Sequence, residues 1–213
     1  MQTRIGKMKH TKFAILLAFL CTLGAGKAAA LPAFDFYYVG FANAWTSLDT
    51  STSETVGHHY GWSISADVRW LARRIALDRD TPAAAGASVS ILHGLHGQFI
   101  AMAASNWLDD GSRYRAWSAL GLGPELGIGI STSNFILPWS QTFFVSAGVL
   151  GNLANYSQTS LYNAYISWLV KASWGLELSK SLALSAALPL EYAFRADGRS
   201  IIATLNLGVR YAF

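Results

Sequence analysis

The chain has 213 residues, of which 52% are hydrophobic and 13% aromatic, whereas only 13% are charged. An average soluble domain carries about 25% charged residues, so this composition argues against an ordinary cytosolic globule and against a disordered chain. A helical membrane protein needs runs of about 18 or more uncharged apolar residues, and only the N-terminus comes near one. The hydrophobicity is therefore dispersed, and its pattern matters more than its amount.

Residues 1–30 have the three parts of a cleavable secretory signal. The first twelve residues include four basic residues and no acid, residues 13–23 are apolar, and three alanines end the segment at Ala30. The apolar run is too short for a single-span anchor. We therefore expect residues 1–30 to be a signal peptide and residues 31–213 to be one exported domain.

Removal of this signal changes the charge of the protein. Lys and Arg fall from 16 to 11 while all 12 acids remain, so the net charge changes from +4 to −1. A nucleic-acid partner would require a persistent basic patch, and we exclude that class. The only cysteine, Cys21, lies in the signal, so the mature protein has no disulfide or thiolate site, and we expect no cofactor.

Three later segments alternate between apolar and polar residues with a period of two: residues 59–70, 162–178 and 201–213. Successive side chains of a strand point to opposite faces, so each segment predicts a strand with one apolar and one polar face. Seventeen residues of alternation in 162–178 exceed the usual strand length of about 3 to 10. A secreted β-sandwich also alternates, but strands of this length favour a membrane barrel.

The C-terminal alternation ends in Tyr211-Ala212-Phe213. This ending resembles the last strand of Gram-negative outer-membrane β-barrels, in which that end is an assembly signal. The mature chain as a whole resembles the small OmpA, OmpX and OmpW class. The resemblance implies an all-β, antiparallel, transmembrane up-and-down β-barrel in a bacterial outer membrane, with outer-membrane lipid and the barrel-assembly machinery as partners.

Deletion of Phe213 should impair assembly in the membrane, because the resemblance makes Tyr211 and Phe213 the C-terminal assembly signal. The measurement is the fraction of membrane-inserted protein with heat-modifiable gel mobility. Normal folded protein after the deletion would contradict the assignment of this signal.

Turn-forming residues divide the mature chain into eight strands with both ends on the periplasmic side, an even number as in bacterial barrels. Turns at residues 93–97 and at Gly123-Pro124 would instead give ten strands. We favour eight because the alternation keeps its parity across both points. The predicted strands are 35–45, 56–70, 86–105, 114–131, 140–152, 162–178, 182–194 and 200–213.

The predicted connections differ between the two ends of the barrel. The outer loops, at residues 46–55, 106–113, 153–161 and 195–199, are rich in Ser, Thr, Asn, Asp and Gly. The inner connections are 71–85, 132–139 and 179–181, and the first of these is long for a periplasmic turn, so part of it could extend a strand. Aromatic residues are expected in two belts at the membrane boundaries. The outer belt is Trp45, Trp107, Tyr156, Tyr162 and Tyr192, and the inner belt is Trp70, Trp139, Tyr211 and Phe213.

The polar faces of the strands carry charged residues that would point into the barrel. An eight-stranded barrel has an interior just filled by side chains, and buried charges there require partners. We predict an interior charge network of Asp67, Arg69, Glu125, Lys171, Glu177, Glu191 and Arg210. The same parity contains His59, His96, Gln98, Asn163 and Asn206. Four glycines at 121, 123, 127 and 129 leave room beside Glu125, either for a solvated pocket or for bulky neighbours.

The sequence contains only weak evidence for a catalytic site or a metal site. A lipid-modifying enzyme would need a lipid-facing Ser–His pair, for which His93 with Ser88 or Ser105 is the only candidate, and Asp109-Asp110 is weak evidence for a protease. His58 and His59 face opposite sides of a strand, and His93 and His96 differ in parity, so neither pair chelates a metal. We therefore expect no catalytic residues and no metal site.

Three classes of function remain. The first is a structural or surface-interaction barrel with a polar, plugged interior. The second is a narrow, porin-like conduit for small or hydrophobic solutes, and the third is a lipid-modifying enzyme. We favour the first, because the interior charges balance well enough to fill the lumen.

Overall fold

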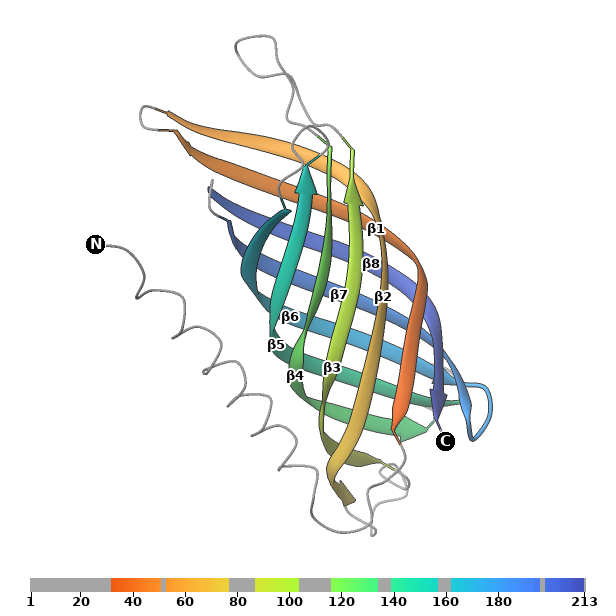
Figure 1. The fold of residues 1–213 in the computed structure, drawn as a ribbon. Helices are drawn as coiled ribbons and strands as arrows, with labels where there is room; N and C mark the ends of the chain where they lie inside the picture. The colour runs from red at the N-terminus through yellow and green to blue at the C-terminus, as the bar shows by residue number, and fades with distance from the viewer. Residues whose placement is uncertain are drawn as a thin grey trace, which may run out of the picture.

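The computed structural model describes residues 32–50, 53–76, 87–103, 116–133, 139–156, 162–195 and 198–212. These residues form eight antiparallel strands that close into one up-and-down barrel, in which β1 pairs with both β2 and β8 (Figure 1). The predicted fold class and the count of eight strands are confirmed. The strands are β1 (Ala33–Thr50), β2 (Ser53–Ala76), β3 (Ser88–Met102), β4 (Trp117–Ser133), β5 (Ser140–Tyr156), β6 (Tyr162–Glu177), β7 (Leu182–Arg195) and β8 (Gly198–Ala212). No helix in this described part of the chain is long and apolar enough to cross a membrane.

The two ends of the barrel are distinguished by the chain termini and by the turn between β1 and β2. Ala33 of β1 pairs with Ala212 of β8, and we call this end the terminal rim. The chain turns from β1 to β2 between Thr50 and Ser53 at the opposite end, which we call the loop rim. In Figure 1 the C-terminus marks the terminal rim, and the hairpin of β1 and β2 projects past the neighbouring strands at the loop rim.

Alternation of side chains determines which residues face outward. In β6, Trp168 and Val170 are 58% and 52% exposed, whereas the alternate residues Leu169 and Lys171 are 1% and 0% exposed. The exposed face is apolar on every strand, as a barrel in contact with lipid requires. The buried face points into the lumen and carries the polar and charged residues, together with a smaller apolar set.

The two alternative turns are both continuous strand. Residues 93–97 lie within β3 and pair with β4 without a change of register. Pro124 lies within β4, and the register with β5 is the same on both sides of it, although the pairs at Gly123 and Pro124 are missing. A proline has no N–H for the ladder, so Pro124 removes hydrogen bonds locally without turning the chain.

Several predicted strand ends are wrong, because the strands extend beyond the apolar alternation. The predicted loop 46–55 is mostly strand: β1 and β2 pair from Thr46↔Gly57 up to Thr50↔Ser53. The backbone ladder of this hairpin therefore continues past the last residue of the apolar alternation. Part of 71–85 extends β2 to Ala76, and β5 extends to Tyr156. The predicted loop 106–113 and the signal 1–30 lie outside the described residues.

A β-bulge interrupts the alternation of β1. The register of β1 shifts between Tyr37 and Gly40 against β2, and between Tyr37 and Val39 against β8. Tyr38 and Val39 are both 53% exposed, so two consecutive side chains point outward. The outward parity changes at this point, from even residues before the bulge to odd residues after it.

The described aromatic residues of the two predicted belts lie on the outward face. Trp45 and Tyr192 are near the loop rim, and Trp70, Trp139 and Tyr211 are near the terminal rim. The side chains of Trp107, Tyr156, Tyr162 and Phe213 lie outside the described part.

Candidate functional site

The lumen is the only place where polar side chains gather away from solvent in the described barrel, and it has three levels. The level nearest the terminal rim is an ion cluster of Asp35, Asp67, Arg69, Glu125, Lys171 and Arg210. An amide layer around Gln98, Asn152 and Glu191 lies above it. A cluster of buried apolar side chains, which we call the apolar plug, lies in the half nearest the loop rim.

Arg69 of β2 is the centre of the ion cluster. Its Nη1 lies 2.6 Å from Asp35 Oδ2, its Nη2 lies 2.6 Å from Asp67 Oδ2, and its Nε lies 3.0 Å from Glu125 Oε1. The guanidinium carbon also lies 4.2 Å from the centre of the Phe144 ring. Arginine is suited to this position, because its planar fork donates in several fixed directions at once. One side chain thus connects β1, β2, β4 and β5 across the lumen.

Lys171 of β6 is the second cation of the cluster, and it is completely buried. Its Nζ lies 2.6 Å from Asp67 Oδ1 and 2.7 Å from Glu125 Oε2. His96 Nδ1 lies 2.6 Å from the same oxygen of Asp67, and Ser146 donates to Glu125 Oε2 at 3.0 Å. Both oxygens of each carboxylate are therefore engaged, which is the condition under which buried charges are tolerated.

The cluster is electrically balanced. Arg210 of β8 donates to Asp35 Oδ1 from Nε at 2.8 Å, which adds a third cation to Arg69 and Lys171. The acids Asp35, Asp67 and Glu125 match these three cations. A neutral cluster of hydrogen-bonded ion pairs fills the lumen without a net charge that would attract counter-ions.

Glu191 lies apart from this cluster, in the amide layer. Gln98 Nε2 donates to one of its oxygens at 2.6 Å, and Asn152 Nδ2 donates to the other at 3.2 Å. Asn152 also donates to Ser167 Oγ at 2.8 Å. On the other side of the layer, Asn206 accepts from Ser63 at 2.8 Å and donates to Ser65 at 3.0 Å. Amides, hydroxyls and one carboxyl group thus fill the middle of the lumen.

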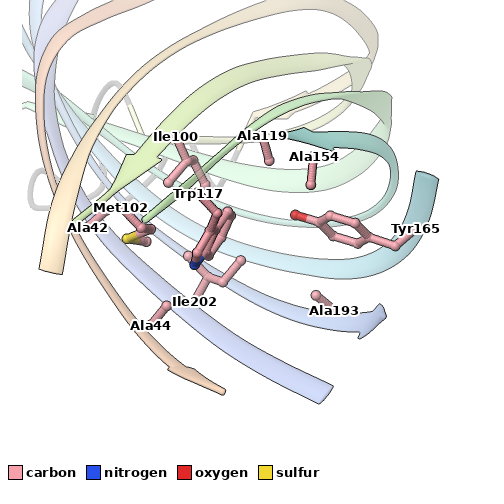
Figure 2. Close-up of a cluster of buried hydrophobic side chains, with 10 residues drawn as sticks. All are labelled: Ala42, Ala44, Ile100, Met102, Trp117, Ala119, Ala154, Tyr165, Ala193 and Ile202. Carbon is pink, nitrogen blue, oxygen red and sulfur yellow. The ribbon is translucent and has the colours of Figure 1, made fainter. Parts of the chain in front are cut away.

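The apolar plug was not predicted, because the alternation in the sequence assigns polar residues to the inward face. Seven strands contribute to it, and Figure 2 shows its side chains converging inside the barrel. Trp117 is the largest of them and is 4% exposed; its ring packs edge-on against His59 of β2 with 6.2 Å between centroids. Its members are Ala42, Ala44, Ile100, Met102, Trp117, Ala119, Ala154, Tyr165, Ala193 and Ile202.

Three of the four inward glycines of β4, Gly121, Gly127 and Gly129, make room for side chains of β3 and β5, whereas Gly123 lies against the backbone of β5. A Cβ on Gly127 would lie 2.6 Å from the Phe144 ring, and one on Gly121 would lie 3.1 Å from Gln98 Cγ. Neighbouring side chains therefore occupy the room beside Glu125 that could have held a solvated pocket. A recess of about 170 Å³ does open at the terminal rim, and Arg69, Phe144, Glu177 and Arg210 are among its lining residues.

The structure brings five of the seven predicted network residues together and separates two. Glu177 is exposed at the terminal-rim recess, where Thr142 donates to it at 3.5 Å, and Glu191 lies in the amide layer. Asp35 was missed, although the alternation Phe34-Asp35-Phe36 marks it as a polar residue facing inward between two outward aromatics. His59, His96, Gln98 and Asn206 are buried on the inward face, and the side chain of Asn163 lies outside the described part.

The histidine and serine candidates do not form a catalytic arrangement in the described residues. His93 is on the outward face, where its ring stacks on Trp70 with 5.9 Å between centroids. Ser88 has the opposite parity and lies about 17 Å away along an extended strand. Ser105 and Asp109-Asp110 lie outside the described residues. His58 and His59 face opposite sides of β2, and no three metal-ligating side chains lie together among the described residues.

Comparisons with known proteins identify the fold. No protein-family model and no curated protein sequence matches the chain. Neisserial surface protein A has a similar structure, with a TM-score of 0.57 and 12% identity over 88% of this chain and 100% of that one. The Ail protein of Yersinia pestis matches with a TM-score of 0.37 and 14% identity over 85% and 99% of the two chains. The protease OmpT of Escherichia coli matches with a TM-score of 0.38 and 6% identity over 88% and 98%.

The chain therefore has the fold of the small eight-stranded outer-membrane β-barrel proteins, the class that its sequence resembles. At 12% identity the likeness concerns the fold alone.

Proposed function

We propose that the protein is an outer-membrane barrel with a closed lumen, which acts through its outer rim and its lipid-facing surface and neither conducts solutes nor catalyses a reaction. The observation that supports this proposal is the packing of buried side chains in the lumen. A permeating solute would have to pass the ion cluster, the amide layer and the apolar plug in turn. Each of these levels consists of side chains that contact protein partners.

The ion cluster supports the proposal on energetic grounds. To open a path past Arg69, its ion pairs with Asp35, Asp67 and Glu125 would have to separate while the carboxylates stay inside the barrel. Removal of one partner from a buried ion pair typically costs about 3–5 kcal/mol. Arg69 and Phe144 are also among the residues that line the recess at the terminal rim, so the recess borders this barrier.

The refolded mature protein should show no steady conductance in a planar bilayer, because the side chains of the three levels would have to separate before a solute could pass. Heat-modifiable gel mobility confirms that the inserted protein is folded, and a general porin in the same bilayer confirms that the assay detects open barrels. Discrete current steps from folded protein would refute the closed lumen and make the conduit the leading function.

A further inference from the structure

Two consecutive tyrosines of β1 point to opposite faces of the strand and differ in their hydrogen bonds. Tyr37 points into the lumen, where it is completely buried and its hydroxyl accepts from Ser185 Oγ at 3.2 Å. Tyr38 points outward and is 53% exposed. Its ring packs edge-on against Phe36 with 4.7 Å between centroids, but its hydroxyl has no hydrogen-bond partner among the described residues. The Tyr38 hydroxyl therefore faces the surroundings of the barrel alone.

The position of Tyr38 along β1 places it inside the apolar band of the membrane. Phe34 pairs with Tyr211 at the terminal rim, and Trp45 lies near the loop rim. Tyr38 is four residues from Phe34 and seven from Trp45, which correspond to heights of about 10 and 18 Å at about 3.3 Å per residue and a tilt of about 40°. The side chain of tyrosine is shorter than either distance, so the hydroxyl cannot reach a boundary of the band.

This depth distinguishes Tyr38 from the other outward tyrosines of the described strands. Those tyrosines lie near one of the two rims: Tyr60, Tyr192 and Tyr211. At a rim, water and lipid headgroups can bond a phenol hydroxyl, which is why tyrosine is common at membrane boundaries. Hydrocarbon chains offer neither a donor nor an acceptor to Tyr38.

The backbone at the same position also lies outside the regular ladders. Tyr38 is the extra residue of the β-bulge, and it has no partner in the pairing of β1 with either β2 or β8. A bulge leaves the hydrogen bonding of its extra residue incomplete. An unsatisfied polar group in contact with hydrocarbon is costly, and here a side chain and a bulge coincide. This coincidence indicates that protein, and not lipid, covers Tyr38.

The face around Tyr38 favours a second copy of this chain as its cover. The exposed side chains that surround it on three adjacent strands are apolar: Phe36, Val39, Phe41, Ile64 and Leu207. None of them is charged, so charge does not select a different partner. A phenol hydroxyl is both a donor and an acceptor. A residue on a two-fold axis meets its own copy, so two Tyr38 hydroxyls each supply what the other lacks.

From this geometry we infer that two copies of the barrel associate side by side in the membrane about a two-fold axis that passes beside Tyr38. The two Tyr38 hydroxyls bond to each other, and the apolar faces of β1 pack around them. Lipid chains are as apolar as these faces, so a hydrogen bond and close packing are the interactions that favour association in a membrane. The inference depends on a membrane location of the barrel and not on the closed lumen.

Cross-linking through a single cysteine tests the position of the interface. Residues 31–213 contain no cysteine, so Val39→Cys introduces the only thiol of the refolded mature protein. Oxidation in dilute phosphatidylcholine vesicles should give a disulfide-linked dimer, because Val39 lies next to the axis and meets its own copy. Leu122→Cys is the control, since Leu122 is equally exposed to lipid but lies on β4, away from β1. Random collisions would cross-link both variants equally, and this result would overturn the inference.

Tyr38→Phe, made in the Val39→Cys protein, tests the hydrogen bond. The substitution removes only the hydroxyl, and the lipid-to-protein ratio at half dimerisation should fall about threefold to tenfold, the effect of one hydrogen bond within a membrane. The change removes a polar atom from the lipid face, so the variant should fold normally, as its heat-modifiable mobility would show.

Tyr60→Phe is the matched control, because it removes the same group from an outward tyrosine near the loop rim. It should leave dimerisation unchanged. Equal dimerisation with and without the Tyr38 hydroxyl, or an equal loss in Tyr60→Phe, would refute the inference. A protein that conducts ions and still dimerises through Tyr38 would contradict only the closed lumen.

Discussion

Lys171→Met should lower the free energy of unfolding in phospholipid vesicles by about 3–5 kcal/mol. Methionine keeps most of the volume of the lysine stem and removes its charge, so the loss reports electrostatics more than packing. Lys171 Nζ contacts Asp67 and Glu125, and both carboxylates are buried. Without Lys171 the cluster has three acids against two cations, and the excess negative charge cannot reach water. Urea unfolding in vesicles, followed by tryptophan fluorescence, gives the free energy.

Two further variants isolate the electrostatic cause. Lys180→Met removes the same charge from the exposed turn between β6 and β7, and its effect should stay within about 0.5 kcal/mol. Glu125→Gln restores neutrality when it is combined with Lys171→Met, because it removes the matching negative charge. The double variant should therefore be more stable than the sum of the two single changes predicts. Strict additivity, or an equal loss in Lys180→Met, would contradict the role of Lys171 in the ion cluster.

The sequence was sufficient to predict the barrel, because alternation constrains the strands strongly. A shift of one residue in the register of a strand would turn its entire apolar face into the lumen. The alternation continues in the same phase across residues 93–97, and this was enough to reject a turn there. The same rule gives the inward direction of Asp67, Arg69 and Lys171. The alternation cannot predict which side chains these residues contact across the lumen. Those contacts depend on the shear and tilt of the barrel, which bring β2 opposite β6, and the sequence of one strand encodes neither the shear nor the tilt.

The apolar plug shows a second limit of the pattern. Ile100, Trp117 and Ile202 point inward, yet an apolar residue gives no sign of which face it occupies when both faces of its strand are apolar.

The bulge in β1 is a third limit of prediction from the alternation. Parity changes between Tyr38 and Gly40, so any assignment that continues the phase of Phe34 and Phe36 would place Asn43 in the lumen. The outward direction of Asn43 was therefore invisible in the sequence.

Gly123→Ala should destabilise the barrel by about 3 kcal/mol, the upper part of the usual range for overpacking. Gly123 faces inward on β4, and a Cβ there would overlap the carbonyl oxygen of Val149 and lie 2.9 Å from Leu150 Cα on β5. These are backbone atoms, so no side-chain rotation relieves the overlap. Gly148 approaches the Pro124 carbonyl of β4 in the same way, and here the ladder between β4 and β5 is interrupted. The absence of a Cβ at Gly123 and at Gly148 therefore allows β4 and β5 to approach each other closely.

Gly151→Ala is the control for this prediction, since it makes the same chemical change on β5 three residues from Gly148. Gly151 points outward, and a Cβ there would meet only Leu122 O, at 3.8 Å, which is an ordinary contact. Alanine is less costly than glycine to order in a strand, so this variant should be neutral or more stable by up to about 1 kcal/mol. Urea unfolding in vesicles measures both variants. Equal effects would show that strand propensity, and not the approach of β4 and β5, sets the cost of a Cβ at position 123. A loss confined to Gly123→Ala would show that this approach is required beside Glu125, the β4 residue that the ion cluster connects to Arg69 and Lys171.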